Sequence, residues 1–544
     1  MLPVVTLRLS TAVSWYCEFY GDDIDAVDDR AGDCYLHGRE IAMQDLKERT
    51  IRGGFAKVCA QAATFLLRVG SLIVLARLLD PVDFGLVGMV TALTGVLNLF
   101  RDFGLSTATV QRANVTEEQI STLFWINVLV GAILGLLAVG IAPVVVVFYH
   151  EPRLFGVTAV LATGFLFNAA GVQHSAILQR HMRFSTLATI DIVSLVVSSA
   201  IGIGMAVGGY GYWALVVMTV TLPLVATVCL WLTTAWIPGR PRKQVGIRSM
   251  MRFGGTITLN CLVVYIAYNF EKILLGRFWG AEAIGMYGRA YQLISIPTDN
   301  LNSAVGGVAL AALSRLQDDA NRLKTYFLKG YSFVLALTVP MTIVCALFAD
   351  DLIAVLLGSK WTGTAVIFRL LAPTILIFAL INPLWWLLVS TGLIGRSLNI
   401  ALIIAPLVIA GYVIGLPYGP TGVALSYSSV MTLWVLPHIA WCVHGTIVSF
   451  QDIMVAVSRP LLSGCAAVAL AFGVQRLYGQ LLPPLPRLVL GVTVLLGVYL
   501  GMLMYVMGQK AFYLDLLRGM RSRSPIEEGN ALVSAKRAEH TSAG

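Results

Sequence analysis

Apolar runs of about twenty residues alternate with short polar segments from residue 55 almost to the end of the chain. A run of this length suits an α-helix that crosses the ~30 Å hydrocarbon core of a bilayer. The pattern therefore predicts an all-α polytopic membrane protein of about 14 transmembrane helices. The predicted spans are 55–77, 84–103, 122–147, 155–177, 187–207, 212–236, 253–277, 284–312, 329–349, 365–390, 397–416, 421–444, 458–476 and 486–508.

The two ends of the chain lack such runs. Residues 1–42 are polar and acidic and are predicted to be an N-terminal extension that need not belong to the functional chain, which could begin at Met43. The polar residues 509–544 predict a disordered cytoplasmic tail. Between these ends, we expect an N-terminal six-helix bundle at 43–252, a C-terminal six-helix bundle at 253–450 and two additional transmembrane helices at 451–508.

An internal repeat supports this division. The sequence LARL at 75–78 matches LGRF at 275–278, and Gly85 and Gly88 match Gly285 and Gly288 with the same 200-residue offset. Six spans separate the two copies, and since six is even, both copies enter the membrane from the same side. The expected architecture is two parallel six-helix repeats, a V-shaped bundle pair around a central cavity, which is typical of transporters.

Composition agrees with a membrane protein. The chain is 57% hydrophobic and 12% charged, whereas soluble domains carry about 25% charged residues. Lys and Arg, which give the net charge of +9, cluster in segments between apolar runs, so they indicate helix orientation rather than nucleic-acid binding. Their distribution predicts that both termini are cytoplasmic in a bacterial inner membrane. The eight cysteines show no CxxC spacing, which argues against a disulfide framework or a metal site.

Ionisable residues inside predicted spans are the candidate site residues, because such groups are costly in lipid and usually functional. Arg68, Lys272 and Arg289 lie deep in their spans and are predicted to line the cavity and bind substrate. This excess of positive charge suits an anionic substrate such as a phosphate or pyrophosphate. The counter-ion or coupling-ion candidates are Glu271, Asp191 and Asp102; Glu271 is expected to pair with Arg289, although it is also a candidate proton or cation carrier.

Signals for enzymatic chemistry are weak in this sequence. The acidic N-terminal segment contains D-x-D spacing but no surrounding strand–helix pattern, the histidines have no metal or catalytic spacing, and no P-loop is present. We therefore predict no enzyme, no catalytic residue, no cofactor and no bound metal.

Four stretches identify a family. The runs LARLLDPVDFGLVGMVTALTGVLNLFRDFGLSTATVQR, QRHMRFSTLATIDIV, GGYGYWALV and NFEKILLGRFWGAEAIGMYGRAYQLISIP resemble the polysaccharide-repeat flippases of the Wzx type. These flippases belong to the superfamily of multidrug, oligosaccharidyl-lipid and polysaccharide exporters. The resemblance covers about residues 43–510 and is diffuse, because its motifs reflect helix packing and turns.

The resemblance implies movement of an undecaprenyl-pyrophosphate-linked oligosaccharide from the cytoplasmic to the periplasmic leaflet, for exopolysaccharide, capsule or lipopolysaccharide biosynthesis. It implies coupling to a proton or sodium gradient or to the membrane potential. The lipid-linked oligosaccharide, the bilayer, a polysaccharide polymerase and chain-length regulator proteins would be the partners, and nucleic acid would not. A peptidoglycan-precursor flippase, a cation-coupled multidrug exporter and a membrane-embedded polysaccharide polymerase remain the alternatives.

Overall fold

The computed structural model describes residues 61–101, 109, 116–241, 248–316, 319–478 and 483–510, and fourteen long helical segments lie within them. The N-terminal extension and nearly all of the tail lie outside the described residues. The long helices, in chain order, are Gln61–Leu78, α3 (Pro81–Leu99), α5 (Glu117–Tyr149), α6 (Leu154–Arg180), α7 (Phe184–Val207), α8 (Tyr212–Thr234), the two halves of α9 (Arg248–Arg315), α10 (Ala320–Leu347), α13 (Pro373–Ser390), α14 (Ile394–Gly415), α15 (Gly419–Val443), α16 (Phe450–Tyr478) and α17 (Pro484–Gly501).

Eleven helical segments of the described chain are long and apolar enough to cross a membrane, and one of them, Gly395–Val443, contains both α14 and α15. The prediction of an all-α polytopic membrane protein is therefore confirmed. Neither half of α9 is among the eleven. Charged and amide side chains make α9 less apolar than its neighbours, and three of them, Lys272, Arg289 and Gln292, line the site described below.

Local sequence signals set the helix ends. Asp80 caps α3 through a reciprocal bonding pattern with Asp83, and Pro81 occupies the first turn, where no backbone N–H is needed. Thr116 and Gln119 form the equivalent capping box at α5. Gly280 has φ 80° and ψ −172°, a conformation that glycine adopts without strain. This single residue joins the halves of α9.

The region 365–390 was predicted as one span and contains two helices. The short helices α11 (Ala349–Leu356) and α12 (Thr362–Leu371) precede α13, and Ala372 separates α12 from α13. Pro373 cannot donate a backbone hydrogen bond, so it begins a new helix where the apolar pattern alone continues unbroken.

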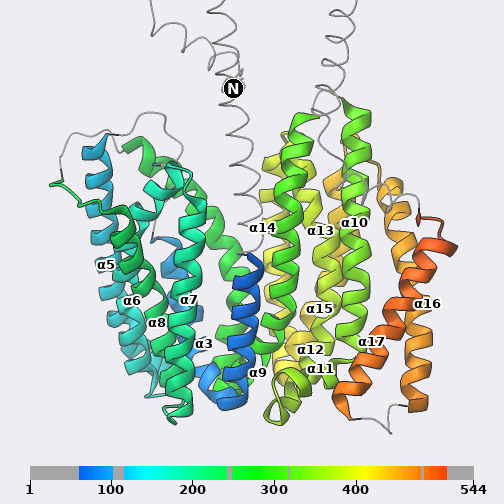
Figure 1. Cartoon of the computed structure of the whole chain (residues 1–544), viewed down its shortest axis with the longest axis horizontal. Helices are drawn as coiled ribbons and strands as arrows, with labels where there is room; N and C mark the ends of the chain where they lie inside the picture. The colour runs from blue at the N-terminus through cyan, green and yellow to red at the C-terminus, as the bar shows by residue number, and fades with distance from the viewer. Residues whose placement is uncertain are drawn as a thin grey trace, which may run out of the picture.

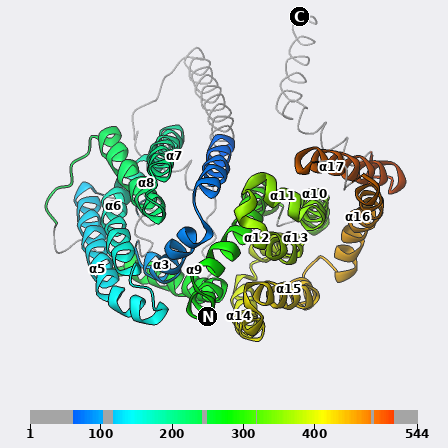
Figure 2. The same cartoon turned by 90° about the horizontal axis from the view of Figure 1, so that it is seen from below.

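The helices form two groups that stand side by side (Figure 1). We call Gln61–Leu78, α3 and α5–α8 the N-lobe, and α10–α15 the C-lobe. Helix α9 packs extensively against α3 and also against α12–α15, so it joins the two groups (Figure 2). Helices α16 and α17 pack against each other and against α10 on the outer side of the C-lobe.

Candidate functional site

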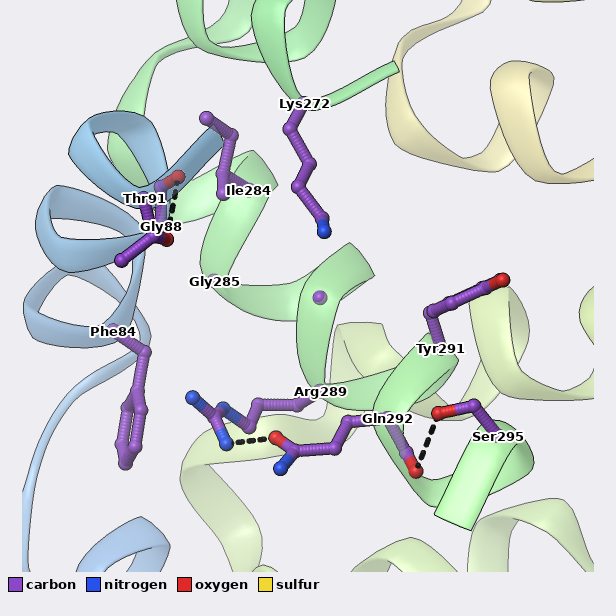
Figure 3. Close-up of a pocket in the computed structure, with 11 residues that line it drawn as sticks. Phe84, Gly88, Thr91, Lys272, Ile284, Gly285, Arg289, Tyr291, Gln292 and Ser295 are labelled. Carbon is purple, nitrogen blue, oxygen red and sulfur yellow. Dashed lines mark hydrogen bonds between the residues drawn. The ribbon is translucent and has the colours of Figure 1, made fainter. Parts of the chain in front are cut away.

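A cavity of about 300 Å³ lies between α3 and α9. It is bounded by residues of α3 on one side and by residues from both halves of α9 on the other (Figure 3). Its lining residues are Phe84, Gly88, Thr91, Lys272, Ile284, Gly285, Gly288, Arg289, Tyr291, Gln292 and Ser295.

Arg289 extends across the cavity toward α3. Its guanidinium carbon lies 4.1 Å from the ring centroid of Phe84, and its Nη1 donates a hydrogen bond to Oε1 of Gln292. A cation over an aromatic face contributes about 0.5–2 kcal/mol, depending on desolvation. Within the described residues no carboxylate lies within 4 Å of this guanidinium, so its positive charge is not neutralised by an ion pair.

Lys272 brings a second positive charge into the same cavity. Its Nζ donates a 2.6 Å hydrogen bond to Oδ1 of Asn269, and, among the residues that the structure covers, it has no carboxylate partner within 4 Å. Lys272 lies eight residues before Gly280 and Arg289 nine residues after it. At ~1.5 Å per residue, both therefore lie roughly 12–14 Å from the turn, at similar depth.

Neutral polar groups complete the cavity wall. Thr91 Oγ1 donates to the carbonyl oxygen of Gly88 at 3.2 Å, and Ser295 Oγ donates to that of Gln292 at 3.3 Å. Gln292 and Ser295 follow Arg289 at helical spacing along one face of α9, and this spacing was a signal that the sequence analysis missed. The cavity therefore offers cationic and hydroxyl groups together, which is chemistry suited to a phosphate or diphosphate.

Glu271 faces away from this cavity. The predicted Glu271–Arg289 pair is wrong: the Glu271 side chain is 1% exposed, and its Oε2 has no hydrogen-bond partner. Successive residues on an α-helix point ~100° apart. Since Lys272 faces the cavity, the buried Glu271 points in a different direction and does not line it.

Arg68 does not share the cavity of Lys272 and Arg289. It lines a second pocket, of about 310 Å³, together with Asp191, between helix Gln61–Leu78, α7 and α8. The two pockets have no lining residue in common. Asp102, the remaining candidate, lies outside the described residues.

The two lobes converge at the lower end of Figure 1, where α3 contacts α9. A Cβ atom placed on Gly85 would lie 1.7 Å from the carbonyl oxygen of Ala281, and one placed on Gly285 would lie 1.9 Å from that of Pro81. Both contacts obey the 200-residue offset found in the sequence, which makes them reciprocal. We call these four residues the glycine seal.

Further bonds hold the same end together. The indole N–H of the fully buried Trp361 donates a 2.7 Å hydrogen bond to the carbonyl oxygen of Ala76, and Lys360 pairs with Asp80 at 2.8 Å. The exposed ion pair contributes at most about 1 kcal/mol, so the close backbone approach and the buried indole dominate this contact.

Near the same end, arginines within the C-terminal spans have carboxylate partners. Arg369 pairs with Asp350 at 2.5 Å, and Arg487 of α17 pairs with the buried Asp351. In the chain as described, no group of three or more His, Cys, Asp or Glu side chains is arranged to hold a metal ion.

The helical groups and the cationic cavity between them define a class, the multi-pass membrane transporters. The fold is similar to that of "Lipid II flippase MurJ, inward closed conformation", with a TM-score of 0.68 and 14% sequence identity over 86% of this chain and 100% of that one. It is also similar to a multidrug resistance MATE family transporter of the MOP superfamily in an inward-facing conformation, with a TM-score of 0.56 and 14% identity over 72% of this chain and 95% of that one.

Sequence comparison shows the family. A family model described as "Polysaccharide biosynthesis protein" matches residues 74–366, which is more than half of the chain. The chain belongs to this polysaccharide biosynthesis protein family. The resemblance noted in the sequence is therefore confirmed.

Two relatives illustrate the range of the family. The chain is 30% identical to the teichuronic acid biosynthesis protein TuaB of Bacillus subtilis over 54% of this chain, a match that spans 61% of the relative's length. It is 24% identical to the lipopolysaccharide biosynthesis protein WzxC of Escherichia coli, over 71% of this chain and 80% of that protein.

Proposed function

We propose that this protein flips an undecaprenyl-pyrophosphate-linked oligosaccharide repeat unit from the cytoplasmic to the periplasmic leaflet of a bacterial inner membrane. The observation that carries the proposal is the pair of cations in one cavity, Lys272 and Arg289, neither of which has a carboxylate partner among the described residues. An unneutralised pair within a membrane span is costly unless an anionic ligand visits it. A diphosphate has the charge and the acceptor oxygens for both groups.

The proposed transport cycle alternates access between two parallel six-helix repeats. All fourteen long helices would cross the membrane, with both termini cytoplasmic, as the positive-inside rule favours. The glycine seal lies at the opposite, periplasmic end in this orientation. The reciprocal Gly85 and Gly285 contacts support a two-fold relation between the repeats. The bound headgroup would reach the cavity from the cytoplasmic side while the lipid tail stays in the bilayer.

Relatives support the same process. The succinoglycan biosynthesis transport protein ExoT of Rhizobium meliloti is 22% identical over 58% of this chain and 64% of its own length. Its name describes transport in succinoglycan biosynthesis, and a repeat unit carried on a lipid diphosphate matches the cationic cavity. A polysaccharide polymerase and chain-length regulators would then act on the product.

Flipping is measured with the purified full-length protein in proteoliposomes that contain a fluorescent lipid-linked diphosphate oligosaccharide. A membrane-impermeant reductant destroys label in the outer leaflet, so the protein should increase the destroyed fraction from about half toward completeness. Proton and sodium gradients and a membrane potential are applied in separate arms. No movement in any arm would overturn the proposal. Preference for a peptidoglycan precursor, or for cationic dyes, would instead support the alternative transporters.

We further propose that Glu271 couples transport to the ion gradient, by binding a proton or a cation. Its carboxylate is buried on α9, on the residue directly before Lys272, and one of its oxygens lacks a hydrogen-bond partner. Glu271→Gln keeps the size of the side chain but cannot titrate. We expect a roughly tenfold slower rate that no longer responds to the gradient.

The matched control is Glu282→Gln, an exposed residue in the second half of the same helix. It should retain both the rate and the response to the gradient. If Glu271→Gln behaved in the same way as this control, coupling through Glu271 would be rejected while the flipping proposal stood.

A further inference from the structure

The pocket that contains Arg68 is a separate, amphipathic site within the N-lobe. It has a volume of about 310 Å³ and lies between helix Gln61–Leu78, α7 and α8. Thr64, Arg68 and Asp191 provide its polar side, and Leu187 and Leu222 belong to its apolar side. Because it shares no residue with the cavity of Lys272 and Arg289, the proposed diphosphate site leaves it unexplained.

Arg68 and Asp191 both line this pocket without touching. Within the described chain no ion pair within 4 Å joins them. Both side chains are exposed to the pocket. An ionised group inside a span is costly unless it has a partner. An anion beside Arg68 and a cation beside Asp191 would satisfy both groups, and one zwitterionic ligand supplies the two charges together.

The apolar side of the pocket indicates what else this ligand contains. Leu195 is buried against the pocket, while Leu222 and Phe184 remain 38% and 44% exposed at its edge. Helix α7 has 24 residues and is therefore ~36 Å long, slightly longer than the ~30 Å hydrocarbon core. Asp191 lies seven residues from the Phe184 end, so the pocket lies within one leaflet, at a depth that hydrocarbon chains occupy.

We propose that this pocket binds a zwitterionic phospholipid of the bilayer, of the phosphatidylethanolamine type. Its phosphate accepts hydrogen bonds from the Arg68 guanidinium, and its ammonium group donates to the Asp191 carboxylate. An acyl chain lies along Leu187 and Leu222. An ethanolamine headgroup fits better than choline, because the primary ammonium has three N–H donors and the quaternary ammonium has none.

Such a lipid would stabilise the position of helix Gln61–Leu78, which also contacts α9. Gln61, which also lines the pocket, donates a 3.1 Å hydrogen bond from Nε2 to Oδ1 of Asn300 on α9. A ligand that joins Arg68 of this helix to Asp191 of α7 therefore supports the same helix that Gln61 joins to α9. The inference goes beyond the proposed flipping activity and does not depend on it.

The test uses the delipidated full-length protein in detergent. Binding of phosphatidylethanolamine, phosphatidylglycerol and phosphatidylcholine with identical acyl chains is measured by native mass spectrometry. The wild type should bind phosphatidylethanolamine about tenfold more tightly than the other two. Soluble glycerophosphoethanolamine should not bind at the same concentrations, because it has no acyl chain. Equal binding of the three phospholipids, or equal binding of the soluble headgroup, would overturn the proposal.

Variants distinguish the contact to the ammonium group from the contact to the phosphate. Asp191→Asn should remove the preference for ethanolamine over glycerol, and Arg68→Gln should weaken both about tenfold. Arg153→Gln, at an exposed pair with Glu151 outside the pocket, is the control and should bind as the wild type does. Should the charge variants fail to fold, Ala188→Leu fills the pocket without changing its charge and should displace the lipid. Unchanged affinity in Arg68→Gln or Ala188→Leu, or displacement of phosphatidylethanolamine from the wild type by equimolar lipid-linked diphosphate, would refute the assignment.

Discussion

Flipping by the Lys272→Gln/Arg289→Gln double variant is expected to fall by about 100-fold or more. Each residue would lose a charge-assisted hydrogen bond to phosphate, which contributes about 1.5–3 kcal/mol, and ~1.4 kcal/mol corresponds to a tenfold change. Each single variant should show roughly the square root of the combined loss. The initial rate in proteoliposomes, at matched protein content, measures the effect.

Two controls accompany this experiment. Arg322→Gln removes an arginine whose side chain is 73% exposed and pairs with Asp319, so it should leave the rate unchanged. Arg289→Lys keeps the charge but not the planar group over Phe84, and it should give an intermediate rate. Wild-type flipping by a double variant that is inserted in normal amount would remove these two residues from substrate binding.

The second large effect is expected at the glycine seal. Gly85→Ala on α3 and Gly285→Ala on α9 each place a methyl group less than 2 Å from a backbone oxygen of the other helix, so the helices must separate. Overpacking of this kind typically costs about 1–3 kcal/mol. Here it destabilises the conformation in which the glycine seal is closed. We expect at least tenfold slower flipping and a cavity that stays open to the periplasmic side.

A cysteine at Thr91, in a background without the eight native cysteines, reports this opening. An impermeant maleimide added from the periplasmic side should label it faster in either glycine variant than in the parent. Gly70→Ala is the matched control, because a Cβ at this helical glycine of the neighbouring helix meets nothing within 4 Å. Identical labelling in the Gly70 and Gly85 variants would show that the close contact does not control access.

Much of the fold could be predicted, because apolar runs and glycine spacing record it directly. The 200-residue offset between Gly85 and Gly285 was visible before the structure, and both residues occupy the same kind of contact. The break at Ala372 was missed because Pro373 follows an apolar run that shows no change in composition. Helix α9 was correctly placed as two segments, although it is the least apolar of the candidate spans.

The depth of the site residues within their spans could be predicted from the sequence, but the direction in which each side chain points could not. The sequence predicted Arg68, Lys272 and Arg289 as deep, cavity-lining residues, and Lys272 and Arg289 do line one cavity. Arg68 lies on a helix that directs it toward α7 and a different pocket. The direction of the Glu271 side chain was also predicted wrongly. It depends on how α9 packs against α14 and α15, and residue spacing in the sequence does not give that packing.

The turn at Gly280 connects the two helical halves of α9 directly. Because a single residue lies between the halves, a tilt of the half with Glu271 and Lys272 would also move the half with Arg289. Under the proposed function, neutralisation of Glu271 would therefore change the position of Arg289 as well as that of Lys272. Inserting a few glycines at the Gly280 turn would therefore uncouple ion binding at Glu271 from substrate release. Every side chain that binds the substrate would be retained.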